Sequence, residues 1–558
     1  MATQNGVAQV AQQTWSIMNG KLDPRLLQGI ARMGFEYLSP VQEMTLTQLP
    51  TYRSDCLVQA KTGTGKTLAF LLPSLHSLLQ SPPLPKGEVA ILVMSPTREL
   101  ALQIAKECEA VTASLVPGIE CHTAYGGTNK DRELKKFTSG DPKIVVATPG
   151  RLNDYLSDQN VARRFNRMRT LVLDEADTML DSGFLIAITE ILSRLPPKSQ
   201  GWQGMCFSAT MPSKIDTVLP KVLKPDYTRL STIDPNESPT IDKVPQHFVI
   251  VPSNREVYNT LYALLQKEHE MSPTGFKAIV FAATANGVAL LNALFTNLLG
   301  KNSSIQVFQL QSRLSQAART RTTNEFKAAT SGLMLASDVI GRGMDFPNTS
   351  HVFQVGLPSN SDQYIHRVGR TARAGNEGRA IILLTQRESF FLKANRRLTI
   401  TPYPTDLSQT AAALSPQVET AFQSVDETIK SKAYQAWLGF HKTSTKQLQL
   451  TNEGLVEQAN EVAETIGCPE PPMIDRQVVG KMGLKGVRGL NVGHVERPSG
   501  GRGGGGVGRG RGGGRGGGAN GGGRGKPEPM ANGSGRVAKP TSEQGGRRRN
   551  RGKGGAQD

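Results

Sequence analysis

One short loop carries the residue types that bind a phosphate chain: Ala60, Lys61, Thr62, Gly63, Thr64, Gly65, Lys66 and Thr67. Glycines let backbone N–H groups approach the phosphates, and a helix that begins here adds positive potential. We expect Lys66 to contact the β- and γ-phosphates of a nucleotide, and the Thr67 hydroxyl to ligate magnesium. The alternative is a glycine turn that only begins a core helix. Lys-Thr at this point has no structural necessity, so we favour phosphate binding, although Ala60 stands where the general pattern has glycine.

Carboxylates follow an apolar run at residues 170–173, where the sequence reads Asp174-Glu175-Ala176-Asp177. Carboxylates at the carboxyl end of a buried strand lie where ligands bind in open α/β sheets. We therefore expect Asp174 to hold magnesium, and Glu175 to orient or deprotonate an attacking water. The alternative is an acidic surface turn, and the phosphate loop in the same stretch of chain argues against it.

Short apolar runs alternate with longer helix-like segments over two stretches of the chain. The runs lie at residues 56–58, 90–94, 144–147, 170–173, 278–281, 332–335 and 351–355. Such runs, separated by helices, are typical of parallel sheets covered on both faces. We predict an α/β fold with two tandem parallel-sheet domains, at residues 21–230 and 246–404. An N-terminal flank (1–20) precedes them, and a polar linker that contains proline (231–245) separates them.

The strand pattern is lost after the second domain. Residues 405–490 are predicted to be a helical extension, in which Tyr434, Trp437 and Phe440 form a packed helix face or, alternatively, a base-stacking surface. From 491 to 558 the chain is rich in glycine and arginine. Residues 499–558 hold 13 Lys and Arg, 3 Asp and Glu and 25 glycines. Such a segment cannot bury enough apolar surface to offset its ordering entropy, so we predict a disordered basic tail.

Charge and cysteine content restrict the class of partner. The 558 residues carry a net charge of +18, which indicates a polyanionic partner, either nucleic acid or an acidic membrane surface. No apolar run approaches the length of a membrane span, so we expect none. Five scattered cysteines show no paired-ligand spacing, which argues against a zinc site or a disulfide framework. The first 20 residues read as neither a signal peptide nor an Arg-rich presequence.

Residues 60–67 and 174–177 together resemble the motifs of the DEAD-box ATP-dependent RNA helicases of superfamily 2. Further motifs of that family follow in order over residues 17–400, among them 34–42, 96–100, 208–210 and 366–373. The resemblance implies two RecA-like domains with ATP in the cleft between them and RNA across both. Within the 34–42 motif, Gln42 would bind the adenine edge. The family usually places an aromatic residue on the adenine 17 positions before Gly34. Ile17 stands there, and Trp15 is the nearby alternative.

The resemblance also assigns residues that contact RNA: Pro96, Thr97, Arg98, Gly126, Gly127, Thr148, Pro149, Gly150, Arg151, Arg319, Ser337, Asp338 and Arg342. Backbone amides, hydroxyls and guanidinium groups suit phosphate and sugar contacts, which position a strand without reading its sequence. By residue type alone these groups would also serve DNA. The preference for RNA follows from the family, since recognition of the 2′-hydroxyl is the physical way to distinguish the two.

In the second domain the resemblance assigns Arg370 and Arg373 as arginine fingers. Guanidinium donors on a separate domain stabilise charge on the γ-phosphoryl group only when the two domains close. Gly343 and Asp345 would contact the ATP, with Asp345 on its ribose. His366 would couple this motif to Asp177 and to the segment that contains Ser208 and Thr210, so that closure needs ATP and RNA together.

The helical extension is similar to that of the fungal mitochondrial RNA chaperones of this family, which remodel structured RNA. It would pack on the second domain, with Lys481, Lys485 and Arg488 as candidate RNA contacts. We expect a monomer in the mitochondrial matrix, with the cytoplasm or nucleus as alternatives, and a tail that tethers RNA electrostatically. Two other functions stay open, an ATP-gated RNA clamp and a translocase on double-stranded DNA.

Overall fold

The computed structural model describes residues 13–179, 184–211, 218–233, 244–300, 303, 305–338, 344–372 and 377–494. Three predicted site residues, Arg342, Gly343 and Arg373, lie outside the described residues. So do most of the predicted linker and the basic tail beyond residue 494. All five cysteines lie inside them, and none of the five is in a disulfide.

The first lobe is built on a parallel sheet of seven strands in the order β3-β4-β2-β5-β6-β1-β7. The strands are β1 (Cys56–Gln59), β2 (Ile91–Met94), β3 (Glu120–Ala124), β4 (Pro142–Ala147), β5 (Thr170–Leu173), β6 (Gln203–Ser208) and β7 (Thr228–Ser231). Successive side chains of β4 divide between two cores: Ile144 and Val146 lie in one, and Val145 and Ala147 in the other. Burial on both faces explains why a central strand such as β2 is apolar without interruption.

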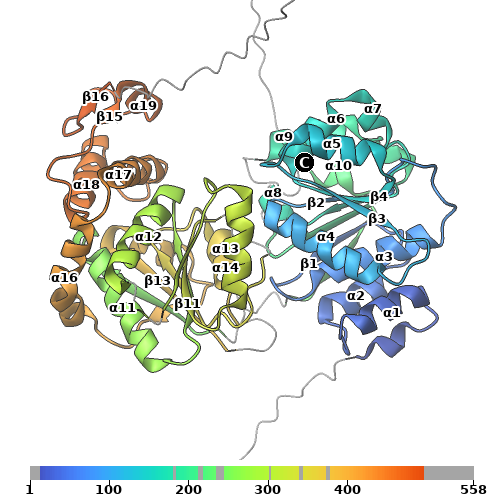
Figure 1. Cartoon of the computed structure of the whole chain (residues 1–558), viewed down its shortest axis with the longest axis horizontal. Helices are drawn as coiled ribbons and strands as arrows, with labels where there is room; N and C mark the ends of the chain where they lie inside the picture. The colour runs from blue at the N-terminus through green and yellow to red at the C-terminus, as the bar shows by residue number, and fades with distance from the viewer. Residues whose placement is uncertain are drawn as a thin grey trace, which may run out of the picture. The chain divides into compact units, whose positions relative to one another are not determined.

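Helices cover both faces of this sheet (Figure 1). One core contains side chains of α1 (Pro24–Arg32), α2 (Pro40–Gln48), α3 (Lys66–Leu79), α4 (Arg98–Thr112) and the short helix η1 (Trp15–Met18). The other contains side chains of α5 (Lys130–Ser139), α6 (Pro149–Leu156), α7 (Gln159–Arg163), α8 (Ala176–Met179), α9 (Leu185–Arg194) and α10 (Leu219–Val222). A further short helix, η2 (Lys198–Gln200), precedes β6.

The second lobe repeats this architecture with the strand order β10-β11-β9-β12-β13-β8-β14. Its strands are β8 (Gln246–Val251), β9 (Lys277–Ala282), β10 (Val307–Leu310), β11 (Gly332–Ala336), β12 (His351–Val355), β13 (Arg379–Thr385) and β14 (Thr401–Pro402), and all pair in parallel. Its helices are η4 (Asn254–Glu256), α11 (Val257–Met271), α12 (Ala285–Leu299), α13 (Gln316–Ala328), α14 (Ser361–Val368), η5 (Gln386–Ser389) and α15 (Phe390–Ala394). Two tandem parallel-sheet units are therefore confirmed.

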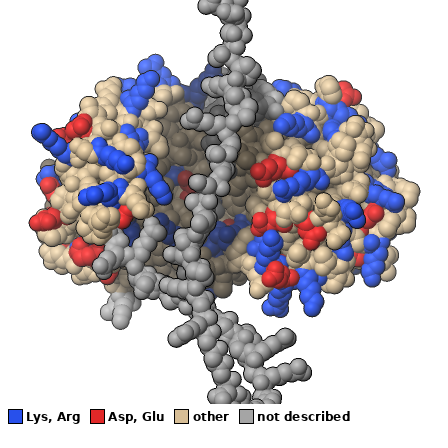
Figure 2. Space-filling model, turned by 90° about the horizontal axis from the view of Figure 1, so that it is seen from above, with Lys and Arg blue, Asp and Glu red and all other residues tan. Residues whose placement is uncertain are grey.

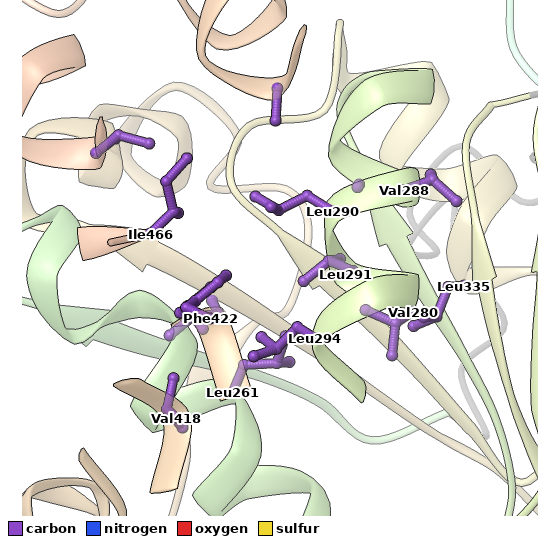
Figure 3. Close-up of a cluster of buried hydrophobic side chains, with 14 of the residues drawn as sticks. Leu261, Val280, Val288, Leu290, Leu291, Leu294, Leu335, Val418, Phe422 and Ile466 are labelled. Carbon is purple, nitrogen blue, oxygen red and sulfur yellow. The ribbon is translucent and has the colours of Figure 1, made fainter. Parts of the chain in front are cut away.

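The helical extension is also confirmed, and it packs on the second lobe. It consists of α16 (Ser408–Gln423), α17 (Glu427–Lys442), α18 (Asn452–Thr465), α19 (Arg476–Lys481) and the short strands β15 (Ile474–Asp475) and β16 (Val492–Gly493). One continuous core joins Leu290 and Leu294 of α12 to Val418 and Phe422 of α16 and to Ile466 after α18 (Figure 3).

The aromatic stripe of α17 is a packed helix face, the first of the two alternatives that the sequence allowed. Tyr434 is fully buried, and Trp437 and Phe440 are partly buried against the apolar cores of this part of the chain. None of the described helices is long and apolar enough to cross a membrane, as expected.

Candidate active site

The phosphate loop connects β1 to α3 in the first lobe. Gly63 and Gly65 both have positive φ (75° and 89°), a conformation that a residue with a Cβ rarely adopts. Lys66 is buried at the start of α3. Its Nζ donates a hydrogen bond to the Ala60 carbonyl (3.3 Å) and lies 3.6 Å from Glu175 Oε1. The Thr64 hydroxyl closes the loop on the Lys61 carbonyl at 2.8 Å.

Gln42 joins the N-terminal helices to this loop. Its side chain accepts a hydrogen bond from the Ser39 backbone (2.9 Å) and donates one to the Gly65 carbonyl (3.2 Å). A Cβ at Gly65 would lie 2.5 Å from Gln42 Nε2, so only glycine allows this close approach. Trp15 is 8% exposed and packs in the core of the first lobe, and Ile17 packs against the same core.

The acidic motif begins where β5 ends, beside the phosphate loop. Burial, together with the adjacent charge of Glu175, raises the pKa of the Asp174 carboxyl. Burial alone would also raise the pKa of Glu175, but the nearby Lys66 ammonium and the His366 ring lower it below its usual value. The Glu175 carboxyl is therefore held as a carboxylate inside the protein.

Asp174 and Thr67 fit a magnesium ion. Asp174 Oδ1 is buried and makes no hydrogen bond with the described residues. A carboxylate and a hydroxyl are the hard oxygen ligands that this cation prefers. The donor set therefore agrees with the predicted pair of ligands, and the pair itself stays a prediction.

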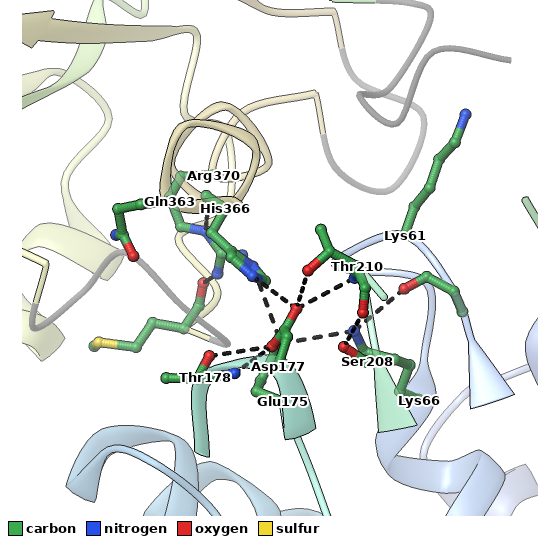
Figure 4. Close-up of polar contacts among 12 residues, drawn as sticks. Lys61, Lys66, Glu175, Asp177, Thr178, Ser208, Thr210, Gln363, His366 and Arg370 are labelled. Atoms are coloured by element: carbon green, nitrogen blue, oxygen red, sulfur yellow. Dashed lines mark hydrogen bonds and ion pairs between the residues drawn. The ribbon is translucent and has the colours of Figure 1, made fainter. Parts of the chain in front are cut away.

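A buried hydrogen-bonded chain crosses from the first lobe to the second (Figure 4). His366 Nε2 of α14 lies 3.2 Å from Asp177 Oδ2. The same oxygen accepts hydrogen bonds from the Thr210 hydroxyl (2.7 Å) and the Thr210 N–H (3.2 Å). The Ser208 hydroxyl donates to the Thr210 carbonyl at 2.6 Å. The structure thus brings together all four residues that the resemblance assigns to coupling.

Arg370 lies in the same region, fully buried just after α14. Its Nε donates to the His366 carbonyl at 3.0 Å, and its Nη1 donates to the Met344 carbonyl. The charge of Arg370 also lowers the pKa of Glu175. Next to it in the chain, Gly369 packs so closely that an added Cβ would overlap the Thr62 hydroxyl of the phosphate loop. Sequence reasoning did not single out Gly369.

The predicted RNA-contact motifs of the first lobe share one edge of the sheet. Residues 96–98, 126–127 and 148–151 follow the carboxyl ends of β2, β3 and β4, which are neighbours in the sheet. Thr97 caps α4, its hydroxyl accepting a hydrogen bond from the Leu100 N–H (3.3 Å). The Arg98 guanidinium packs so closely on Gly127 that a Cβ there would overlap it. On the face seen in Figure 2, basic and acidic side chains are interspersed.

Two of the predicted RNA-contact arginines are buried in ion pairs. Arg151 Nη1 lies 2.5 Å from Glu133 Oε2, and Arg151 also donates to the Thr128 carbonyl (3.0 Å). Arg319 Nη2 of α13 lies 2.5 Å from Glu99 Oε2 of α4, so this pair joins the two lobes. The role of Glu99 was missed, although the residue stands within the 96–100 motif. Its buried partner is more than 200 positions away, and no sequence pattern links the two.

Ser337 and Asp338 follow β11, where Asp338 Oδ1 accepts hydrogen bonds from Arg367 Nε (2.8 Å) and Gln363 Nε2 (2.7 Å). Asp345 lies close enough to Lys277 of β9 and to Glu107 of α4 to shift their pKa values. Asp345 of the second lobe is thus placed at the boundary with the first. Contacts of these residues with RNA and nucleotide stay predictions.

Comparisons with known proteins agree with this geometry. Two family models match the chain, the DEAD/DEAH box helicase over residues 39–218 and the helicase conserved C-terminal domain over residues 256–375. The chain is 55% identical over 479 residues to the "ATP-dependent RNA helicase MSS116, mitochondrial" of Phaeosphaeria nodorum, with 86% of each chain covered. It is 56% identical over 484 residues to the protein of that name in Aspergillus oryzae, with 86% of this chain and 75% of the relative covered.

A solved structure of Mss116p bound to ssRNA and AMP-PNP is similar to the fold, with a TM-score of 0.75 at 26% identity. The likeness covers 85% of this chain and 95% of that one. It therefore extends over both lobes and into the extension.

Proposed function

The chain belongs to the DEAD-box family of ATP-dependent RNA helicases, and we propose from that premise that it hydrolyses ATP when RNA is bound and locally unwinds or remodels structured RNA without reading its sequence. The observation that carries this proposal is the buried chain from His366 through Asp177 to Thr210, which crosses between the lobes beside the phosphate loop. Mss116p bound to ssRNA and AMP-PNP supports the same assignment of ligands.

The first lobe binds the triphosphate of ATP. Backbone N–H groups of residues 61–66 and the N-terminus of α3 face the phosphates, and Lys66 exchanges its contact with the Ala60 carbonyl for the β- and γ-phosphates. Gln42 holds the loop through the Gly65 carbonyl and lies at the base side of the site. Thr67 and Asp174 hold magnesium, which when bound neutralises charge on the phosphates.

Hydrolysis requires groups from both lobes. The Glu175 carboxylate, kept charged by nearby cations, accepts a hydrogen bond from the attacking water and orients it. Arg370 supplies guanidinium donors to charge that develops on the γ-phosphoryl group. Because Arg370 comes from the second lobe, turnover depends on closure of the two lobes.

RNA favours closure because it contacts both lobes. The predicted contacts lie at the common edge of β3, β4 and β2 in the first lobe, and after β11 and on α13 in the second. RNA and ATP therefore bind the same closed arrangement, and each raises the affinity for the other. Phosphate and sugar contacts position the strand without a base code.

The test is RNA-stimulated ATP hydrolysis by Lys66→Ala and Arg370→Lys. Lysine keeps the charge of Arg370 but lacks the planar fork of donors. Loss of an arginine finger lowers kcat by about 10³-fold or more, and we expect a loss of that order in Arg370→Lys. Lys221→Ala, which changes an exposed lysine of α10, is the matched control. RNA-stimulated turnover that survives in either variant contradicts the proposal.

Strand displacement separates remodelling from clamping. We expect multiple turnovers of short RNA duplexes with ATP. A long-lived complex without displacement would instead identify an ATP-gated clamp. Equal stimulation of ATP hydrolysis by RNA and DNA would contradict the assignment of the sugar contacts to 2′-hydroxyls.

The two fungal relatives that are 55% and 56% identical over the aligned residues are named mitochondrial, which supports a mitochondrial location. The finer assignment to the matrix follows from an RNA-remodelling role, since matrix RNA would be the client. Imaging of the native protein together with protease protection of isolated mitochondria tests it. Signal in the cytoplasm or nucleus alone would contradict it.

A further inference from the structure

A surface cavity of about 280 Å³ lies at the edge of the first sheet where β1, β5 and β6 begin. These three strands are neighbours in the order β5-β6-β1, so the segments that precede them meet at this edge. Arg53 precedes β1, Arg169 precedes β5 and Trp202 precedes β6, and all three residues line the cavity. The phosphate loop and the predicted RNA contacts of this lobe follow the carboxyl ends of strands, so this arginine cavity lies at the opposite edge of the sheet.

Both arginines are held in place by the chain at the end of α3. Arg169 Nη2 donates a hydrogen bond to the Pro82 carbonyl at 2.5 Å. Arg53 Nη2 donates to the Ser81 hydroxyl at 2.7 Å, and that hydroxyl donates to the Ser77 carbonyl at 2.6 Å. A guanidinium group has several N–H donors, and these contacts use one nitrogen of each group. The remaining donors therefore belong to two side chains that are already positioned.

The arginine cavity has an excess of positive charge. No Asp or Glu is among the described residues that line it. Arg169 Nη1 is buried and makes no hydrogen bond with the described residues. Burial lowers the pKa of the Arg169 guanidinium, and the positive charge of Arg53 lowers it further. A buried donor without an acceptor, close to a like charge, is an environment that a bound anion would stabilise.

The arrangement of these donors favours a phosphate group over a carboxylate. Two guanidinium groups that come from the segments before β1 and β5 need acceptor oxygens on more than one side of the ligand. A carboxylate offers two oxygens in one plane, whereas a phosphoryl group offers three around a tetrahedral centre. Guanidinium groups bind phosphate oxygens through paired N–H donors. The cavity is far larger than the volume of one water molecule, so a phosphate group fits with part of the molecule that carries it.

We propose that the arginine cavity is a phosphate-binding site of the first lobe, in which Arg53 and Arg169 bind a phosphate group either of a small phosphorylated molecule or of RNA outside the predicted RNA edge. The site is additional to the nucleotide site and does not rest on the proposed function. From the cavity, β5 leads to Asp174, β6 leads to Ser208, and α3 leads back to Lys66. Because the ligand binds only the folded lobe, it should raise the temperature at which this lobe unfolds.

The test is thermal unfolding of the full chain over a range of inorganic phosphate concentrations, at constant ionic strength and with saturating AMP-PNP and magnesium. The nucleotide occupies the phosphate loop, so added phosphate is not bound there. The concentration dependence of the unfolding temperature gives an apparent affinity for phosphate. We expect Arg169→Ala to weaken this affinity about tenfold or more, because a hydrogen bond to a charged group contributes at least about this factor. Arg169→Lys keeps the charge without the planar fork of donors and should weaken the affinity less.

Arg163→Ala is the matched control, because it removes an arginine at an exposed position of α7 and changes the net charge equally. Phosphate also stabilises folded proteins in general, by exclusion from their surface, and this effect is common to all the variants. Equal apparent affinities in Arg169→Ala and Arg163→Ala overturn the proposal. If Arg169→Ala does not fold, Arg53→Ala, at an exposed position, decides by the same criterion.

Fluorescence anisotropy of labelled RNA distinguishes the two sources of the phosphate group. If RNA supplies it, Arg169→Ala should weaken RNA binding and reduce the slope of log affinity against log salt concentration by about 0.7 for a single strand. If a small phosphorylated molecule supplies it, the affinity for RNA should stay unchanged while the affinity for phosphate falls. Both results support the site, whereas an unchanged affinity for phosphate overturns it whatever the RNA result.

Discussion

Glu99 and Arg319 are each about 5–6% exposed, and their buried ion pair joins the two lobes. Removing one partner of a buried pair leaves an uncompensated charge and costs about 3–5 kcal/mol. Separation of the lobes would return both groups to water. The cost of an unpaired charge therefore arises only while the lobes are together, and it destabilises the closed arrangement relative to the open one. We expect Glu99→Ala to weaken RNA binding in the presence of a non-hydrolysable ATP analogue.

Fluorescence anisotropy of labelled RNA, measured with and without the analogue, checks this prediction. The loss should be largest with the analogue, when the lobes close. The exchanged pair, Glu99→Arg with Arg319→Glu, should recover part of the affinity. If Glu99→Ala has the same effect with and without the analogue, the pair does not act through closure.

Gly369 is a second position where one added atom, a Cβ, would disturb the contact between the lobes. Its φ is −66°, so alanine fits the backbone, but the added Cβ would overlap the Thr62 hydroxyl of the other lobe. We expect Gly369→Ala to lower RNA-stimulated ATP hydrolysis by about tenfold, because a change of 1.4 kcal/mol in closure is a factor of ten.

Nucleotide binding should be kept in this variant, since the phosphate loop belongs to the first lobe. Gly118→Ala is the control, because a Cβ at Gly118 meets no atom within 4 Å. If RNA-stimulated turnover is unaltered in Gly369→Ala, the phosphate loop moves away from the added Cβ with no loss of closure free energy, and the prediction is wrong.

At the scale of elements, β3 contains a buried titratable group that ties the stability of the first lobe to pH. Burial, with a contribution from Lys136, lowers the pKa of His122 to about 4. Its Nε2 lies 3.3 Å from the Tyr155 hydroxyl. Between pH 6.5 and 4 the unfolded chain binds a proton at this ring that the folded chain does not. Stability is therefore complete above pH 6.5 and falls as the pH drops toward 4.

From pH 7.5 to pH 5.0 this one ring should lower the free energy of unfolding of the first lobe by about 2 kcal/mol. His122→Asn removes the titration, so urea unfolding of the variant should lose about 2 kcal/mol less over this interval. His494→Asn, at an exposed position, is the control and should keep the full pH dependence. If the free energy of unfolding of His122→Asn depends on pH as strongly as that of the unaltered chain, the folded state does not disfavour protonation of His122, and the prediction is wrong.

The two sheets were predictable because their central strands, such as β2, β5 and β9, are short apolar runs separated by longer helix-like segments. The helical extension was predictable because this strand pattern stops after residue 404. The phosphate loop and the acidic motif were predictable because their chemistry is local in sequence. Strand order and ion pairing were not. The Arg319–Glu99 and Arg151–Glu133 pairs depend on helices brought together by the tertiary fold, and no spacing in the chain encodes them. Burial of Trp15 likewise depends on the core that forms around it.

At the scale of the whole molecule, residues 499–558 add a strongly basic segment outside the described structure, with 13 Lys and Arg against 3 Asp and Glu. Each phosphate neutralised on a single strand contributes about −0.7 to the slope of log affinity against log salt concentration. Deletion of 499–558 should therefore weaken RNA binding and flatten this slope, and ATP hydrolysis at saturating RNA should be unchanged. RNA titrations at several salt concentrations measure the slope, and an identical slope after deletion would contradict a tethering role.

The shared core of α12, α16 and the segment after α18 has a practical consequence for anyone who divides the chain. A cut between β14 and α16 would expose this hydrophobic core as a large apolar surface on each fragment, and both fragments would tend to aggregate. A better position to divide the chain lies just before β8. A recombinant fragment that starts near residue 244 and runs through residue 494 keeps this interior whole.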